Sequence, residues 1–139
     1  MLTVEKGAIA EAAVYKAFAM LGIPVYLPMA DGGVADCVIS LPAGLKSVQI
    51  KLAHLQEGRI TATTTYRIGS KRRGYGTYAG IVDYIAVYCI ENDTCYAISA
   101  NECASSLVLR TIPAANGQLT GIKMAHEYTF DKIFGPLAQ

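Results

Sequence analysis

The sequence lacks the long apolar run that a membrane-spanning helix requires, although apolar residues are abundant. Of its 139 residues, 53% are hydrophobic and only 17% are charged, and the mean hydropathy is +0.32. No stretch approaches the roughly 18 apolar residues of a membrane span, and no signal-peptide pattern opens the chain. We therefore expect a single cytoplasmic domain over residues 1–139, with no membrane contact. The apolar excess indicates either a sheet buried on both faces or a surface that meets another copy of the chain.

Several motifs that would assign the chain to a familiar enzyme class are also missing. There is no Gly-x-Ser-x-Gly elbow, no phosphate-binding P-loop and no dinucleotide-binding fingerprint. His126-Glu127 lacks the second histidine of a zinc protease helix. The four cysteines form no CxxC pair and have no histidine at zinc spacing, which favours free thiols. A disulfide between Cys89 and Cys95, which flank a turn, is the less favoured alternative.

Acidic residues are absent between Gly58 and Val82, and this stretch is basic and rich in tyrosine and glycine. The net charge of +1 argues against a protein that coats DNA by charge alone, so the distribution of charge is more informative than its sum. We predict a DNA-contacting loop at about residues 67–78, in which basic side chains neutralise phosphates and one or two side chains read base edges. A solvated loop is the alternative. The predicted DNA-contacting residues are Arg59, Arg67, Lys71, Arg72, Arg73 and Tyr75.

Two strand patterns, residues 35–40 and 47–52, are joined by a turn that contains proline and glycine, and together they predict a β-hairpin. Alternate side chains of a strand share a face, so Gln49 and Lys51 project to the same side. Asp36 lies on the partner strand, where aspartate is disfavoured, and residues that break a local rule are often functional. A carboxylate, an amide and an ammonium that converge in this way suit metal-assisted attack on a phosphodiester.

An N-terminal helix is predicted over residues 4–21, because apolar residues recur at helical spacing and Gly22 follows as a stop signal. Glu11 lies on the same face as Val14 and Phe18, so its carboxylate borders the packed stripe. A carboxylate in such a place usually has a partner, and both a lysine and a metal ion fit that description. Further strands are expected near residues 25–27, 59–66, 81–90, 95–98 and 107–112, and further helices at 99–107 and 124–134.

Three other polar residues have plausible structural roles. Asp31 precedes glycine, which is typical of a turn. A lone histidine such as His54 after a strand is more often a surface or packing residue than a catalytic one. Asp83 opens a strand, where turns and salt bridges are the common explanation.

The order Glu11, Asp36, Gln49-Ile50-Lys51, on a helix and two successive strands, resembles the PD-(D/E)XK nuclease superfamily, whose core motif is an aspartate followed by an acidic residue, any residue and lysine. It is most similar to the homing endonucleases of this type encoded in group I introns, in which glutamine can replace the second acidic residue. Archaeal Holliday junction resolvases are a more distant likeness. The resemblance extends over most of the chain, including strand 83–88 and segment 109–116. It implies an α/β fold that is restriction endonuclease-like, with a central mixed β-sheet flanked by helices.

The resemblance also implies a site-specific, Mg²⁺-dependent endonuclease that cuts double-stranded DNA. Glu11, Asp36, Gln49 and Lys51 are then the catalytic candidates, with the metal ion held by Asp36, the Gln49 side-chain oxygen, the Ile50 carbonyl and Glu11. We expect Mg²⁺, for which Mn²⁺ substitutes, because this ion prefers oxygen ligands. Lys51 is expected to orient or deprotonate the attacking water and to stabilise the transition state.

A double-strand cut needs two such sites, so a homo-oligomer is expected, either a dimer or a tetramer. Three alternatives remain open on the same fold: a Holliday junction resolvase, a restriction-like nuclease, and a catalytically inactive DNA-binding module.

Overall fold

The computed structural model describes residues 2–30, 32–67 and 75–136. Its elements, in chain order, are α1 (Thr3–Met20), β1 (Val25–Tyr26), β2 (Cys37–Leu41), β3 (Gly44–Gln56), β4 (Arg59–Thr63), β5 (Thr65–Arg67), β6 (Tyr75–Thr77), β7 (Tyr84–Cys89), β8 (Thr94–Ser99), η1 (Ala100–Glu102), β9 (Ser106–Arg110), η2 (Ala125–Glu127) and α2 (Phe130–Phe134). Among the residues described, no helix has the length and apolar composition needed to cross a membrane.

The 13-residue strand β3 organises the sheet, because it pairs with three other strands. Its first part pairs antiparallel with β2, its middle pairs parallel with β7, and its last three residues pair antiparallel with β4. One part of the sheet therefore contains β1, β2, β3, β7 and β8, and β3 then continues into a second part with β4 and β9. The predicted central mixed sheet is confirmed.

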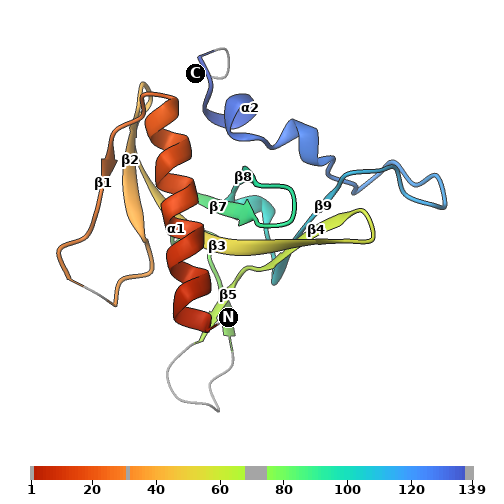
Figure 1. Cartoon of the computed structure of the whole chain (residues 1–139), viewed down its shortest axis with the longest axis horizontal. Helices are drawn as coiled ribbons and strands as arrows, with labels where there is room; N and C mark the ends of the chain where they lie inside the picture. The colour runs from red at the N-terminus through yellow and green to blue at the C-terminus, as the bar shows by residue number, and fades with distance from the viewer. Residues whose placement is uncertain (1, 31, 68–74, 137–139) are drawn as a thin grey trace.

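Helix α1 covers one face of this sheet (Figure 1). Its buried residues, Ala10, Val14 and Phe18, recur every four positions and form one stripe of the helix. The Phe18 ring also contacts two rings of α2, with centroid distances of 4.8 Å to Phe130 and 5.2 Å to Phe134. The helix predicted at residues 4–21 is confirmed to within one residue at each end.

The opposite face of the sheet is also buried. Ile85 and Val87 of β7 lie in a core that includes Ile60 of β4 and Leu109 of β9, all completely inaccessible to solvent. Strands β4 and β9, with the chain that follows β8, therefore cover this face. The expectation of a sheet buried on both faces is confirmed, and it accounts for much of the apolar composition.

The helix predicted at residues 99–107 is wrong beyond its first turn. Only η1 forms, and the backbone is already extended at Cys103, with φ of −107° and ψ of 137°. The Ser99 side chain makes no capping hydrogen bond. Leu107 and Leu109 alternate with more exposed residues on β9, which pairs with β4 along its whole length, so strand pairing replaces the helix that the local spacing favoured.

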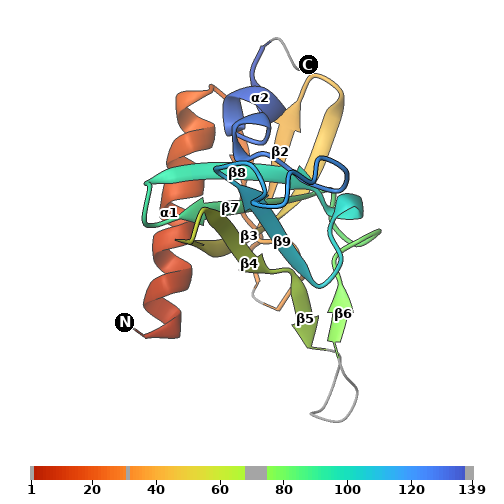
Figure 2. The same cartoon turned by 90° about the vertical axis from the view of Figure 1, so that its right-hand side faces the viewer.

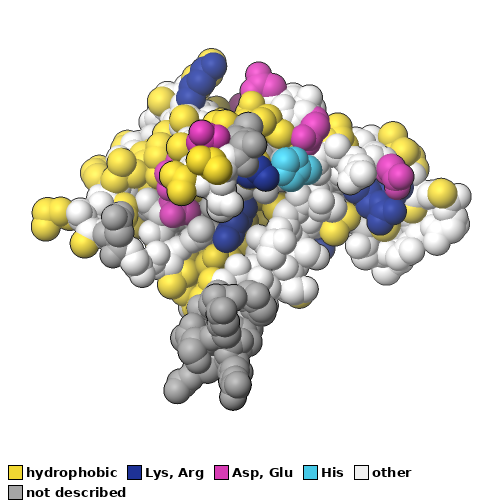
Figure 3. Space-filling model, turned by 60° about the horizontal axis from the view of Figure 1, so that its bottom comes forward, with side chains coloured by type: hydrophobic (Ala, Val, Ile, Leu, Met, Phe, Trp, Pro, Cys, Tyr) yellow, Lys and Arg dark blue, Asp and Glu magenta, His cyan; other side chains and the backbone are white. Residues whose placement is uncertain are grey.

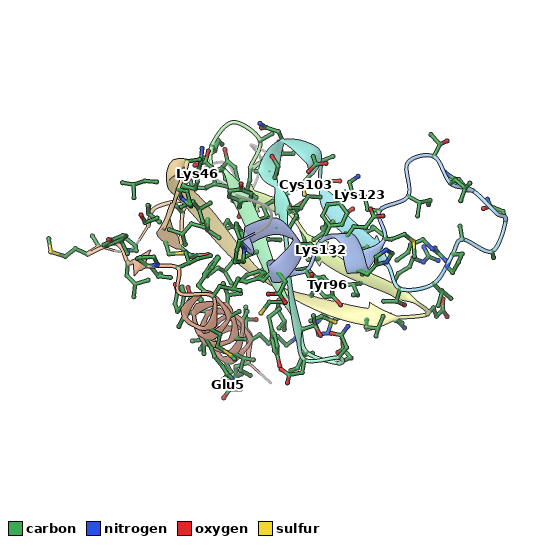
Figure 4. The ribbon with its side chains drawn as sticks, turned by 90° about the horizontal axis from the view of Figure 1, so that it is seen from above. Glu5, Lys46, Tyr96, Cys103, Lys123 and Lys132 are labelled. Carbon is green, nitrogen blue, oxygen red and sulfur yellow. The ribbon has the colours of Figure 1, made fainter. Side chains whose placement is uncertain are left out.

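The helix predicted at residues 124–134 is divided into η2 and α2. At the break, the Tyr128 carbonyl accepts the backbone N–H of Ala97 at 2.9 Å, and Thr129 forms a β-bridge with Tyr96. The backbone is extended at Thr129, with φ of −66° and ψ of 159°, so a continuous helix is excluded. Figure 4 shows the result, with α2, which carries Lys132, lying across β8, which carries Tyr96.

Strands β5 and β6 form a separate two-stranded sheet, which we call the ribbon, that extends away from the main sheet (Figure 2). The strand predicted at residues 59–66 is therefore two strands, and Thr64 separates them. Thr64 is fully buried, its N–H donates to the Ser105 carbonyl at 3.0 Å, and its hydroxyl donates to the Ala104 carbonyl at 3.0 Å. These bonds fix the base of the ribbon to the body of the protein.

All four cysteines are free, as predicted. Burial raises the pKa of three thiols most clearly, to about 12 for Cys37, about 12 for Cys95 and about 11 for Cys103. They are therefore protonated at neutral pH and behave as small apolar side chains.

Candidate active site

Asp36 lies at the point where β2 and β3 separate. The last register pair of the two strands is Cys37 with Val48, and β3 pairs with β4 only from His54 onward, so residues 49–53 have no partner from β2 or β4 and form the free edge of β3. The backbone N–H of Asp36 donates to the Val48 carbonyl at 2.8 Å, and its Oδ2 accepts the backbone N–H of Ile50 at 2.7 Å. The carboxylate thus replaces the missing strand partner and is held beside the Gln49-Ile50-Lys51 segment. This confirms the predicted hairpin, which closes more tightly than expected, on Pro42 and Ala43.

Glu11 approaches the same edge from α1. Glu11 and Asp36 line one cleft of about 240 Å³, together with Tyr15 and the loop between β1 and β2. Burial raises the pKa of Glu11, and the charge of Asp36 raises it further. Burial also raises the pKa of Asp36, against the opposing effects of the Ile50 N–H and of Lys51. Two half-buried carboxylates that disfavour each other's charge form a site that a cation stabilises.

Gln49 and Lys51 come from the other face of the sheet. Their neighbours Val48 and Ile50 are buried against α1, so the alternation of the strand directs Gln49 and Lys51 away from the helix. Gln49 Nε2 donates to the Ile50 carbonyl at 3.3 Å. Lys51 lines an adjacent hollow of about 370 Å³ with residues of β4, and its Nζ lies 5.3 Å from the centre of the Tyr78 ring. Glu11 and Asp36 therefore share one cleft, and Gln49 and Lys51 project from β3 beside Asp36.

The available donors fit a hard divalent ion. Within the part of the chain that the structure describes, no three histidine, cysteine, aspartate or glutamate residues gather into one group. Glu11 and Asp36 supply carboxylates, and the Gln49 amide and the Ile50 carbonyl supply neutral oxygens. Mg²⁺ is bound in this way by one or two carboxylates while it retains several waters, whereas structural zinc requires four nitrogen or sulfur ligands. The residues Asp36, Glu11, Gln49 and Ile50 thus suit magnesium.

The predicted DNA-contacting residues do not all belong to one element. Arg67 and Tyr75 are in register on opposite strands of the ribbon. Lys71, Arg72 and Arg73 lie outside the described residues, as does Asp31. Arg59 is separated from the ribbon, because it begins β4 at the end opposite Thr63 and pairs with Arg110 of β9. In Figure 3, acidic and basic side chains lie close together on the face that carries the ribbon, among apolar ones.

A model of the PD-(D/E)XK endonuclease family matches residues 1–131. The chain belongs to this family. PD-(D/E)XK enzymes are nucleases that generally use divalent metal ions, and their substrate is DNA. In the predicted catalytic motif, position 49 is a glutamine instead of the family's second acidic residue.

The fold of this nuclease is shared with a bacterial homing endonuclease, I-Ssp6803I. The two structures agree with a TM-score of 0.71 over 93% of this chain and 89% of that chain, at 20% sequence identity. The comparison with curated proteins gave no match. The family and the restriction endonuclease-like fold that the sequence predicted are confirmed.

Two polar residues considered in the sequence have structural partners. His54 lies within β3, not after it, is exposed, and contacts Glu91 Oε2 through its Nδ1 at 3.1 Å. Asp83 Oδ2 accepts the backbone N–H of Ser47 at 2.9 Å and its hydroxyl at 3.2 Å, which joins the start of β7 to β3.

Tyr78 is the last residue of the predicted DNA-contacting loop at about residues 67–78. The structure instead buries it, with only 4% of its surface exposed, beneath Lys51. Tyr78 and Lys51 are 27 positions apart in the sequence, so no local pattern indicates their contact.

Proposed function

We propose that this nuclease is a site-specific, Mg²⁺-dependent DNA endonuclease, encoded in a group I intron and active as a homing endonuclease in the cytoplasm. The observation that carries the proposal is the meeting of Glu11 and Asp36 beside Gln49-Ile50-Lys51 at the free edge of β3. The structural likeness to a bacterial homing endonuclease over nearly the whole chain supports the finer assignment. Mn²⁺ is expected to replace Mg²⁺, since both are hard ions that accept oxygen ligands.

The residues of the site have separate tasks. Asp36 is pre-oriented by the Ile50 N–H, so one carboxylate oxygen is occupied and the other is available for the metal ion. A bound Mg²⁺ supplies positive charge at the scissile phosphate and a water of lowered pKa. Lys51 holds an ammonium near the same edge, where it orients the attacking water and stabilises the charge that develops on the phosphate. Gln49 contributes a neutral oxygen, which leaves the site with one negative charge fewer than a Glu-x-Lys site.

The ribbon supplies the expected DNA contact. Arg67 and Tyr75 lie at its distal end, and the basic residues 71–73 connect them in the sequence. Phosphate contacts of this kind fix the register of the duplex, which allows the free edge of β3 to meet one phosphodiester. Arg59 and Arg110, adjacent on β4 and β9, offer a second basic position at a distance from the ribbon.

The first test is cleavage of genomic DNA from the source organism in the presence of Mg²⁺. Wild type should give discrete fragments, and Lys51→Ala should give none while it still binds the DNA. Lys46→Ala is the matched control, because Lys46 lies on the same strand but lines a different pocket (Figure 4). We expect this control to cut like the wild type.

Other outcomes have definite meanings. Equal cutting by wild type and Lys51→Ala would contradict the proposed site. If the wild type binds DNA without cutting it, the inactive DNA-binding module is favoured. The missing negative charge at Gln49 would then explain the loss of activity. Faster cutting of a four-way junction than of linear duplex would favour a junction resolvase.

A further inference from the structure

An aromatic ring lies close to the Lys51 ammonium. Its Nζ lies 5.3 Å from the centre of the Tyr78 ring, within the range of a cation–π interaction. Lys51 forms no ion pair with any residue that the structure describes. Lysine has a flexible four-carbon side chain, so an ammonium without a specific contact would sample many positions. Besides its charge interaction with Asp36, the Lys51 ammonium has the Tyr78 ring as a contact that restricts its position.

Tyr78 is itself held firmly. Its ring is almost completely buried and packs against the Tyr66 ring, with centroids 5.2 Å apart. Its carbonyl accepts the backbone N–H groups of Ile81 at 3.0 Å and Val82 at 3.2 Å. A buried ring whose own backbone is hydrogen-bonded and which contacts an aromatic neighbour provides a rigid surface for the lysine.

The aromatic neighbour belongs to the ribbon. Tyr66 is the central residue of β5, and Tyr78 directly follows β6, so the two tyrosines close the base of the ribbon. The buried Thr64 fixes this base through its bonds to the 104–105 segment. Tyr66, Tyr78 and Lys51 thus form a continuous series of contacts between the ribbon and the free edge of β3.

We infer that Tyr78 is a positioning residue that holds Lys51 in its active position and joins the lysine to the base of the DNA-contacting ribbon. This inference rests on the proposed function, because it assigns a purpose to the position of Lys51. Tyr78 touches neither the DNA nor the metal ion in this scheme. Its ring face attracts the ammonium, and its contact with the tilted Tyr66 ring sets the position of that face relative to the ribbon.

The test compares Tyr78→Met with Tyr78→Phe. Methionine fills a similar volume without a ring, whereas phenylalanine keeps the ring face. In single-turnover cleavage of the mapped target duplex, Tyr78→Met should be slower by about 10-fold, while the Kd for DNA stays unchanged. Tyr78→Phe should restore the rate to within about twofold. An unchanged rate in Tyr78→Met, or a loss confined to DNA binding, would overturn the inference.

The link to the ribbon is tested by a double-mutant cycle with Tyr66→Met. If Tyr66 acts through Tyr78, the double variant should be no slower than Tyr78→Met alone. Losses that simply add would mean that the two tyrosines act independently, and would overturn the link.

A second measurement does not depend on cleavage. In protein labelled with ¹³C at the lysine ε-carbons, the Lys51 ε-methylene resonance should be shifted upfield by the Tyr78 ring in the absence of metal and DNA. The shift should persist in Tyr78→Phe and disappear in Tyr78→Met. An unshifted resonance in the wild type would overturn the inference whatever the cleavage result. A shifted resonance, combined with full activity of Lys51→Ala, would instead contradict the proposed function of Lys51.

Discussion

At the scale of single residues, the site depends on two carboxylates placed where each is less easily ionised than in water. Burial is the main cause of the raised pKa of both Glu11 and Asp36, and the neighbouring Asp36 charge adds to the effect at Glu11. A group whose pKa is raised on folding stabilises the folded state below its unfolded pKa, and this contribution is lost as the pH rises through the folded pKa. The metal-free nuclease therefore carries electrostatic strain at neutral pH, and cation binding relieves it.

The first prediction concerns Glu11→Gln. Removal of one of the two repelling charges should leave the metal-free protein as stable as the wild type at neutral pH, or more stable by less than about 1 kcal/mol. The same change should weaken Mg²⁺ binding at least about tenfold, because a ligand charge is lost. Thermal unfolding with and without Mg²⁺ measures both effects. A variant that loses stability yet binds Mg²⁺ as tightly as the wild type would contradict the role of Glu11.

The wild-type protein should also show a pH dependence of metal binding. Protons compete with the metal ion for carboxylates of raised pKa, so Mg²⁺ affinity should rise with pH through and above the range in which ordinary carboxylates titrate. Calorimetry from about pH 4 to about pH 8 should record this rise in affinity. It should also record proton release on Mg²⁺ binding at the acidic end of this range. An affinity that does not change over this range would exclude Glu11 and Asp36 as ligands.

Gln49→Glu provides a prediction for the residue that we propose takes the place of the motif's second acidic residue. A third carboxylate should raise Mg²⁺ affinity about tenfold and preserve cleavage, because glutamate keeps the oxygen ligand. The hydrogen bond from Gln49 Nε2 to the Ile50 carbonyl is lost in this variant. Loss of cleavage with tighter metal binding would therefore show that the amide nitrogen is required to position the Ile50 carbonyl.

At the scale of elements, the ribbon depends on the residue at its base. Thr64 is the only completely buried polar residue among those described, and both its hydroxyl and its N–H are bonded to the 104–105 segment. The 104–105 segment leads directly into β9. Thr64 is therefore the residue at which the chain stops pairing with β9 and begins the ribbon. The orientation of the ribbon is thus determined by hydrogen bonds over 40 positions of sequence.

Thr64→Val should test this anchor. Valine has the shape of threonine but leaves the Ala104 carbonyl without its hydroxyl donor, at a cost of about 1 to 2 kcal/mol in the free energy of unfolding. Thr63→Val is the matched control, because Thr63 is the exposed neighbour at the end of β4. Urea denaturation of the three proteins measures the difference. Equal stability of the two variants would mean that the Thr64 hydroxyl does not anchor the ribbon.

At the scale of the whole molecule, part of the remaining apolar exposure lies near the β1 edge of the sheet. Leu27 and Met29, in the loop after β1, have relative exposures of 62% and 104%, and Tyr26 and Leu45 are also exposed. Strand β1 is an outer strand of two residues with one free edge. Exposed apolar residues beside a free strand edge are typical of an interface between copies of a chain.

We therefore expect a dimer or a tetramer in solution, with two sites that cut the two DNA strands. Light scattering at about 10 µM protein should give two or four times the monomer mass. At this concentration an interface of standard size is occupied. Met29→Lys should reduce this mass without loss of folded structure by circular dichroism. A wild-type monomer at that concentration would contradict the expectation.

The amino-acid sequence by itself determined the elements whose stability is local. Helix α1 follows from apolar residues at helical spacing with Gly22 beyond them, and the β2–β3 hairpin follows from alternation around Pro42 and Gly44. The hairpin also made Asp36, Gln49 and Lys51 recognisable as candidates, because strand alternation and a short turn leave little freedom in their placement.

Only the tertiary structure decided the features that depend on distant partners. The spacing of Ser99 and Glu102 favours a helix up to residue 107, but residues 103–107 lead into the strand that pairs with β4. The Tyr128 carbonyl accepts the backbone N–H of Ala97 of β8, and the backbone is extended at Thr129. Tyr78 is polar enough for a loop, yet it is buried because Lys51 and Tyr66 meet there. Hydrogen bonds and burial between segments far apart in the chain outweigh local preferences of a few tenths of a kcal/mol per residue, so no local pattern reveals them.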